Sequence, residues 1–245
     1  MKHGARSTPL FTAVLIMICY GVVSAQWDKK PYSDWSEKES LKLLNDSPWG
    51  QTQSLVDTSK MFDRDRRLSS GQSRIVDTPQ VDFRIRFLSA KPVRQAISRY
   101  LEIKQKNEMG DQMASQLKSF AAADFPDYII ITVLVEAPSP TNEFRQAVAT
   151  LDKLTTGDLT NNTYLVTKGG QRIFVKEYQS PRKDGLGARF IFPRTVEGKP
   201  YLTPDSGEVQ FFSELGGLMM MQGKPVHLST RYKVKEMMFQ GKLEY

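Results

Sequence analysis

The chain has 245 residues, of which 40% are hydrophobic, and its 34 basic against 27 acidic residues give a formal charge of +7. The apolar fraction is too high for a wholly disordered chain, and the chain is too long for a small protein held together by disulfides. The positive charge is far below that of a nucleic-acid-binding domain, so nucleic acid is not an expected partner. We expect one or two globular domains.

Residues 1–25 have the pattern of a secretory signal peptide. Lys2 and Arg6 form a basic start, residues 10–23 are mostly apolar, and small residues precede a cleavage site after Ala25. The 14 residues of the apolar stretch fall short of the roughly 20 that cross a bilayer. We therefore expect cleavage rather than an uncleaved anchor, a mature chain without a transmembrane span, and a secreted or periplasmic location.

Cleavage would change the chemistry that the mature chain can perform. Cys19 is the only cysteine, and His227 would be the only histidine left. Disulfides, thiolate nucleophiles and cysteine-based zinc sites would therefore be excluded from the mature chain. The loss of Lys2 and Arg6 lowers the formal charge from +7 to +5. We expect no metal and no cofactor.

Residues 26–50 predict a short helical arm at the start of the mature chain. The arm contains all three tryptophans, Trp27, Trp35 and Trp49. Ser36 and Glu39 match a capping box, in which each side chain bonds the backbone N–H of the other residue, and the helix is expected to end at Asn45. A sugar-stacking platform is one role for the indoles, but docking onto the main domain is favoured because each ring can bury a large apolar area. Residues 51–74 are polar and charged and predict a linker.

The main domain is expected to span residues 75–245. Apolar and polar residues alternate over 81–87, which predicts a half-buried strand. Ser89 is the expected N-cap of a helix that continues over 93–101. A second amphipathic helix is expected over 109–120.

Residues 128–135 are almost continuously apolar and rich in β-branched side chains, which predicts a central strand buried on both faces. A helix is expected near 144–151, and strands dominate after it, starting with a hairpin that turns at Lys168-Gly169-Gly170. Further strands are expected over 188–192, 208–212, 226–234 and 237–245. This order predicts an α+β fold, with a largely antiparallel sheet and two or three packed helices after the helical arm.

Three short stretches resemble a family of uncharacterised secreted bacterial proteins. They are Trp35-Ser36-Glu37-Lys38-Glu39 with Asn45-Asp46-Ser47-Pro48-Trp49, the stretch from Phe87 to Arg94, and the stretch from Phe239 to Leu243. The resemblance implies a bacterial envelope or extracellular location. It implies no activity, because none is known for that family, and no functional residue is transferred from it.

Serine chemistry has only a weak signal. Ser115 with Lys118, and Ser180 with Lys183, match S-x-x-K, in which a lysine activates a serine one helical turn away. Ser115 falls in mid-helix, and the sequence contains neither of the S-D-N and K-T-G triplets that accompany this motif. A Ser-His-Asp triad could use only His227, whose chain neighbours would point to the opposite face of a strand. We therefore assign no catalytic residue.

Carboxylates and methionines supply the remaining alternatives. Glycosidases need two carboxylates in a cleft, and Glu136, Asp205 and Glu208 stand at strand ends, where solvated charges are also common. Met219–Met221 would suit Cu(I), but an apolar segment that fills a core gap is favoured, followed by a methionine-lined partner surface. The Gly185–Gly187 loop lacks the following helix that a phosphate cradle needs.

A basic strand is the last candidate surface. Arg84 and Arg86 lie on the polar side of their predicted strand, with Lys91 and Arg94 just beyond it. Such a patch would suit an anionic glycan, a lipid headgroup or a nucleic acid. A solvated face that acidic neighbours such as Asp82 and Glu102 partly neutralise is favoured over a binding patch.

These observations predict a secreted or periplasmic, non-enzymatic binding or envelope-associated protein. Its partner surface would use the methionine run or the basic strand, and the partners considered are an envelope protein and an anionic glycan. The alternative is a carboxylate-dependent hydrolase acting on an extracellular polymer, which needs two inward-facing carboxylates in a cleft.

Overall fold

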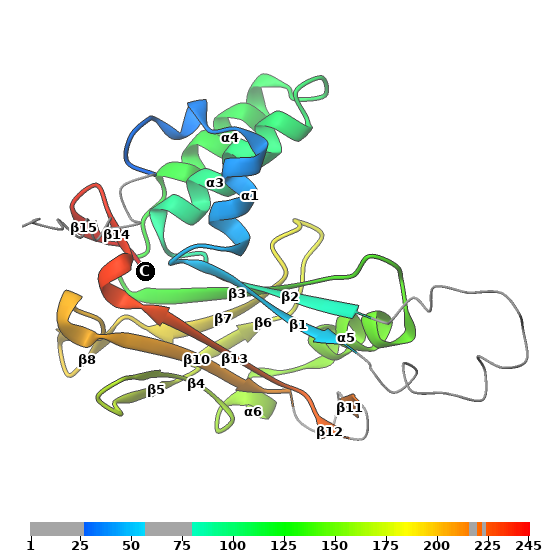
Figure 1. Cartoon of the computed structure of the whole chain (residues 1–245), viewed down its shortest axis with the longest axis vertical. Coiled ribbons are helices and arrows are strands. Elements are labelled where there is room, and N and C mark those ends of the chain that lie inside the picture. Colours follow the sequence, from blue (N-terminus) through cyan, green and yellow to red (C-terminus); the bar gives the residue numbers. More distant parts are fainter. Residues whose placement is uncertain (1–26, 57–79, 216–219, 222–223) are drawn as a thin grey trace, which may run out of the picture.

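The computed structural model describes residues 27–56, 80–215, 220–221 and 224–245. Two antiparallel β-sheets pack face to face (Figure 1). The five-stranded sheet has the order β1 (Gly50–Val56), β2 (Gln80–Phe87), β3 (Tyr128–Glu136), β7 (Ala188–Pro193) and β6 (Glu177–Gln179). The four-stranded sheet has the order β13 (His227–Lys233), β10 (Glu208–Glu214), β4 (Thr163–Thr167) and β5 (Arg172–Phe174). The predicted α+β class is confirmed, and β3 occupies the predicted central position.

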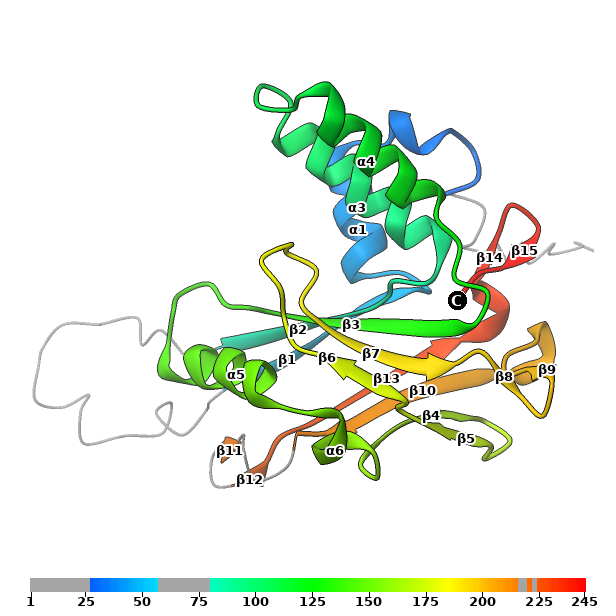
Figure 2. The ribbon, with the colours of Figure 1, turned by 180° about the vertical axis from the view of Figure 1, so that it is seen from behind.

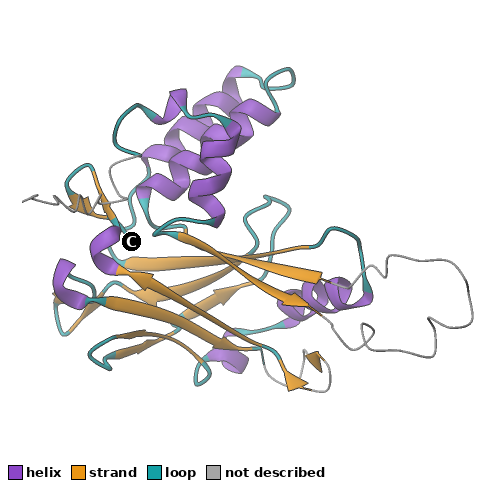
Figure 3. Cartoon of the chain, viewed as in Figure 1, coloured by secondary structure: helices purple, strands orange, loops and turns teal. Residues whose placement is uncertain are grey.

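Three helices form a layer on the side of the five-stranded sheet that faces away from the four-stranded sheet (Figures 2 and 3). We call this layer the helical unit; it consists of α1 (Glu37–Asn45), α3 (Lys91–Lys104) and α4 (Asp111–Ala122). The chain passes from β3 to β4 through α5 (Asn142–Lys153) and α6 (Thr156–Leu159). Within the described ranges, no helix is both long enough and apolar enough to cross a membrane.

Short elements complete the fold. Three 3-10 helices are η2 (Tyr32–Asp34), η3 (Pro204–Ser206) and η5 (Val234–Glu236). Three pairs of two-residue strands are β8 (Thr195–Val196) with β9 (Lys199–Pro200), β11 (Met220–Met221) with β12 (Lys224–Pro225), and β14 (Met238–Phe239) with β15 (Lys242–Leu243).

The core lies between the two sheets. The alternating apolar residues of β2 are fully buried, which confirms the predicted strand. Phe87 of β2 packs edge-to-face on Tyr232 of β13, with ring centroids 4.8 Å apart, and the Tyr232 hydroxyl donates to the carbonyl of Ile85 at 3.1 Å. Phe190 of β7 and Phe211 of β10 form a second such pair at 5.5 Å. Large rings from both sheets therefore interlock, and a buried tyrosine hydroxyl has a partner across the interface.

The N-terminal arm belongs to this core. The indoles are buried, with exposed fractions of 4% for Trp27, 1% for Trp35 and 0% for Trp49, so they form no sugar-stacking platform. Residues 50–56 pair with β2 as an edge strand, so the prediction of a linker is wrong for its first residues, 51–56. The rest of that predicted linker lies outside the described residues, as does the predicted signal peptide.

Two local predictions differ from the structure. Ser89 does not cap α3, because the N-cap position falls on Ala90 and the Ser89 hydroxyl instead accepts from the N–H of Ile130 at 3.0 Å. The strand expected over 237–245 is a hairpin, in which Gln240 and Gly241 both have positive φ and turn the chain between β14 and β15. A two-residue turn with positive φ at both positions matches the twist of the flanking strands.

The predicted capping box of α1 is confirmed, and it should make the free energy of unfolding depend on pH. The Glu39 carboxylate accepts from the Ser36 N–H at 2.7 Å and from the Ser36 hydroxyl at 2.8 Å, and it lies 3.0 Å from Lys30 Nζ. The backbone hydrogen bond from Ser36 is the largest cause that lowers the pKa of Glu39 to about 2. The unfolded chain, with a higher pKa, binds more protons, so this stabilisation is present above about pH 4.5 and lost as the pH falls toward 2.

Replacing Glu39 with glutamine is therefore expected to lower the free energy of unfolding by about 1 kcal/mol at pH 7. The wild type and the E39Q variant should converge between about pH 3 and pH 2, which urea unfolding at several pH values would measure. E108Q, at an exposed residue whose side chain makes no bond to the described residues, is the control and should match the wild type. A constant difference between the wild type and E39Q at all pH values would contradict this account.

Candidate functional site

The basic strand forms the partly neutralised face that its sequence favours only at Arg84, which pairs with Asp82 as predicted, whereas Arg86 is buried. Arg84 pairs with Glu136 at 3.0 Å and with Asp82 at 3.3 Å. Arg86 is only 6% exposed, and its guanidinium donates to two oxygens at the end of α1, at 3.0 and 2.7 Å. Burial is the main cause that lowers the pKa of Arg86, to about 10, so it stays a cation at neutral pH. The helical unit covers this end of the sheet, which explains the burial.

Arg94 is also buried, with 2% exposed, and this part of the prediction is wrong for the same reason. Its guanidinium donates to the carbonyls of Leu88 and Ala123 and lies 5.1 Å from the centre of the Phe125 ring. Burial lowers the pKa of Arg94. Glu102 pairs with Arg99 on its own helix instead of with the strand. These arginines join segments of the fold and offer no continuous basic patch.

The structure does not bring the candidate carboxylates together. Glu136, Asp205 and Glu208 are all exposed. Glu136 ends β3 on the five-stranded sheet, whereas Asp205 lies in η3 and Glu208 begins β10 on the other sheet. Among the described residues, no group of three or more His, Cys, Asp and Glu side chains is placed to hold a metal ion.

The remaining candidates from the sequence are the serines of the S-x-x-K matches, the glycine loop and the methionine run. Ser115 is exposed in the middle of α4, and Ser180 directly follows β6. The Gly185–Gly187 loop joins β6 to β7, as expected. Met219 lies outside the described residues, and Met220 with Met221 is described only as the backbone of β11, so the methionine prediction stays untested.

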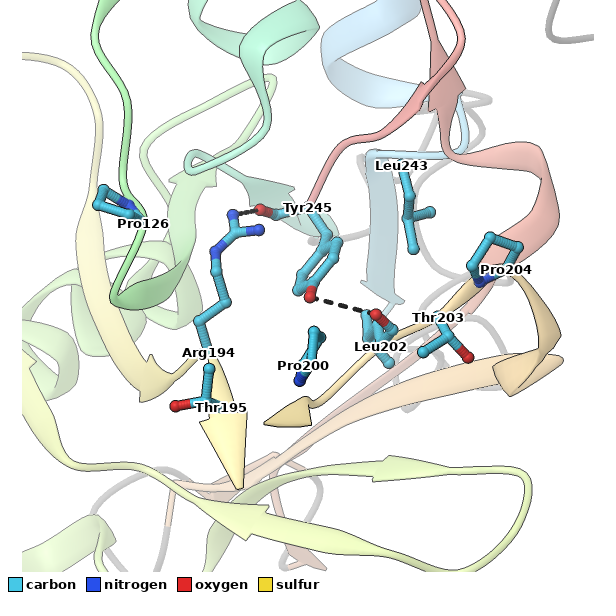
Figure 4. Close-up of a pocket in the computed structure, with 9 residues that line it drawn as sticks. All are labelled: Pro126, Arg194, Thr195, Pro200, Leu202, Thr203, Pro204, Leu243 and Tyr245. Carbon is cyan, nitrogen blue, oxygen red and sulfur yellow. Dashed lines mark hydrogen bonds between the residues drawn. The ribbon is translucent and has the colours of Figure 1, made fainter. Parts of the chain in front are cut away.

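A pocket of about 450 Å³ lies beside the C-terminal hairpin (Figure 4). It is lined by Pro126, Arg194, Thr195, Pro200, Leu202, Thr203, Pro204, Leu243 and Tyr245. Arg194 Nε donates to the Phe125 carbonyl at 3.0 Å, and its guanidinium carbon lies 4.2 Å from the centre of the Tyr245 ring. The Tyr245 hydroxyl donates to the Leu202 carbonyl at 3.2 Å. The lining is largely apolar and contains no Asp or Glu, so this pocket does not supply the carboxylate pair that the hydrolase alternative requires.

The outer face of the four-stranded sheet carries a row of exposed and half-buried rings, which we call the aromatic row. Its members come from four strands and are Phe174 of β5, Tyr164 of β4, Phe212 of β10 and His227 of β13. The register places Tyr164 opposite both Phe174 and Phe212, so three of the rings are direct cross-strand neighbours. Phe174 is 45% exposed and His227 is also exposed. A contiguous group of exposed rings, unlike a single exposed ring, is a candidate for a binding surface.

Three of the four rings of the aromatic row form a stack. Tyr164 and Phe212 are stacked with centroids 5.1 Å apart and planes 23° apart, and Phe212 stacks on His227 at 5.9 Å and 26°. Phe174 instead meets Tyr164 edge-to-face, with centroids 5.8 Å apart and planes 67° apart.

A second row, which we call the arginine row, runs beside the aromatic row. It consists of Arg172 of β5, Val166 of β4, Gln210 of β10 and Arg231 of β13, which are paired across the strands in this order. Arg172 lies 4.8 Å from the centre of the Tyr164 ring, and the Gln210 amide donates to the Ser229 hydroxyl at 2.7 Å. No carboxylate of the described residues lies in ion-pair contact with Arg172 or Arg231.

The β13 end of both rows is held by β1. The Gln53 side chain donates to the His227 carbonyl at 2.9 Å and accepts from the Ser229 N–H at 2.8 Å. Gln51 donates in the same way to the Arg231 carbonyl. These side chains satisfy three backbone groups along the outer edge of β13 and so help to fix the strand that carries His227 and Arg231.

His227 lies where the strand pattern predicts it, but the surface around it was not predicted. His227 is exposed while Val226 and Leu228 are buried on the opposite face, as its spacing predicts. The rings of this surface occupy the solvent-facing positions of their strands: Tyr164 and Phe212 alternate with the buried residues Leu165 and Phe211. An aromatic residue at a solvent-facing position of an amphipathic strand is the sequence feature that would have indicated this surface.

Comparisons of the chain with models of known protein families, with curated proteins and with solved structures gave no match. The resemblance to a secreted bacterial family therefore stays an expectation. The geometry of the outer face is the basis for any statement about function.

Proposed function

We propose that this chain is an exported, non-enzymatic binding protein that holds an anionic glycan on the outer face of its four-stranded sheet. One observation carries the proposal: the aromatic row and the arginine row lie side by side on that exposed face. The signal-peptide pattern of residues 1–25 supports export, because it has the basic start, the apolar stretch and the small cleavage residues of such signals.

The charges and rings of this face favour an anionic partner. Arg172 and Arg231 are exposed cations without an ion-pair partner among the described residues, and guanidinium groups bind carboxylates and phosphates through paired hydrogen bonds. The ring edges of the aromatic row carry the positive part of the ring quadrupole, which favours contact with oxygen atoms. Gln210 and Ser229 add an amide and a hydroxyl for neutral hydroxyl groups.

The ring geometry favours a glycan over a single-stranded nucleic acid. Bases bind such surfaces by stacking on free ring faces. The facing sides of Tyr164 and Phe212 cover each other, and Arg172 lies over the Tyr164 ring. A sugar chain has no planar bases to stack, and it can use the hydroxyl-binding groups between the two arginines.

Binding to polygalacturonate, a carboxylate-bearing polysaccharide, tests the proposal directly. The mature protein should bind it by affinity electrophoresis and calorimetry, bind neutral dextran at least ten-fold more weakly, and leave the polymer length unchanged. F174A should weaken binding about five-fold through loss of ring contact, and R172Q about ten-fold through loss of a charge-assisted contact. The matched controls are M113A and R182Q, which alter an exposed apolar residue and an exposed arginine outside this sheet.

Four results would overturn the proposal. They are no binding to any of several carboxylate- or sulfate-bearing glycans, equal weakening by the control variants, tighter binding to poly(dT) than to the glycans, and shortening of the polymer. The last of these would instead support the hydrolase alternative.

A further inference from the structure

The charged residues on the outer face of the four-stranded sheet favour one direction for a chain bound to that face. Arg231 on β13 and Arg172 on β5 stand at opposite ends of the arginine row, and their backbones are three strand spacings, about 14 Å, apart. Glu214 and Glu208 stand at the two ends of β10, with their side chains on the same face as Gln210 and Phe212. Cations therefore mark the two sides of the face, and carboxylates mark both ends of a path along β10.

We infer, building on the proposed function, that the ligand is a polyanionic sugar chain lying across the four strands, with one anionic group at Arg172 and another at Arg231. A chain running along β10 would pass over both Glu208 and Glu214, and like charges at contact distance repel. A chain running across the strands follows the two rows and meets a guanidinium at each side. The two glutamates then border the path instead of blocking it.

This arrangement sets a minimum length for tight binding. One sugar ring is smaller than the separation of the two arginines, so a single residue can contact only one of them at a time. A chain that spans both makes its second contact within the same complex, which raises affinity without any new kind of contact. Affinity should rise steeply with chain length until both arginines are occupied, and then level off.

Oligogalacturonates of increasing defined length, titrated by calorimetry, provide the test. With a long oligomer, R172Q and R231Q are each expected to weaken binding about ten-fold, and the double variant about a hundred-fold. With the monomer, each single variant should change the dissociation constant by no more than about two-fold, because the other arginine still binds. R182Q is the control with no effect at any length, and circular dichroism of each variant confirms that these exposed substitutions leave the fold intact.

The outcomes separate this inference from the proposed function. Binding that is independent of length, or a long-oligomer affinity that R231Q leaves unchanged, would overturn the inference and leave glycan binding in place. A larger gain from E208Q or E214Q than the loss from the arginine variants would indicate a chain along β10, and would overturn it as well. Failure to bind at every length would overturn both.

Discussion

Replacing Trp49 with alanine is expected to lower the free energy of unfolding by about 3–5 kcal/mol, the range for removal of a fully buried aromatic side chain. Trp49 has no exposed surface and packs edge-to-face on Phe239, with ring centroids 6.2 Å apart. Its indole N–H also donates to the Glu244 carbonyl at 2.9 Å. The alanine variant therefore loses apolar contact and leaves a main-chain acceptor without its donor, in a contact between segments 195 residues apart in sequence.

The phenylalanine variant separates these contributions. W49F keeps most of the ring volume but loses the N–H donor, so it should cost only about 1–2 kcal/mol. Urea unfolding followed by both far-ultraviolet circular dichroism and tryptophan fluorescence is the measurement, and both probes should report one transition. A W49A variant within 1 kcal/mol of the wild type, or a helical signal lost in a separate earlier transition, would show that the arm is not part of the cooperative core.

Docking of the tryptophans onto the domain was predicted and is confirmed, but the position at which the arm docks could not be predicted. The capping box could be predicted because capping depends only on residues three apart. Residues 50–56 contain glycine, two glutamines, threonine and serine, so their strand has little apolar alternation. Their position depends on pairing with β2 and on the docking of Trp49 against the end of the chain, and a sequence pattern contains no information on such distant contacts.

Periodic segments were predictable, because burial on one face repeats every two residues in a strand and every 3.6 residues in a helix. β2 alternates strictly, and β3 is buried over five consecutive residues, which matches its central place between β2 and β7. The burial of Arg86 could not be predicted from such a period. Arg86 occupies the polar phase of β2 yet is buried, because α1 covers that side of the sheet and supplies carbonyl acceptors.

The aromatic row also depends on contacts between segments that are distant in sequence. The hairpin that was expected to turn at Lys168-Gly169-Gly170 forms, and it pairs Tyr164 with Phe174. The presence of Phe212 beside them depends on the pairing of β10 with β4, two strands that are separated by 40 residues of chain. The aromatic row exists only once that register is known, so the sequence showed its members but not their association.

Replacing Gly187 with alanine is expected to lower the free energy of unfolding by about 3 kcal/mol or more. Gly187 has φ of +81°, a conformation that costs other residues about 1–2 kcal/mol. A Cβ atom there would also lie 2.3 Å from the Val133 carbonyl oxygen and 2.8 Å from Leu134 Cα, so the backbone of the central strand would have to move. Because Val133 pairs with Ala188, the next residue, this shift would disturb the register where β7 joins the sheet.

Gly185, two residues earlier in the same loop, provides the matched control. It has φ of +73°, but an added Cβ atom would meet no atom of the described residues within 4 Å. G185A should therefore cost only the conformational strain, about 1 kcal/mol, and the difference between the two variants isolates the collision with β3. Equal losses for G185A and G187A in urea unfolding would mean that the loop does not approach Val133 as closely as the structure places it, and the packing of β7 on β3 would need revision.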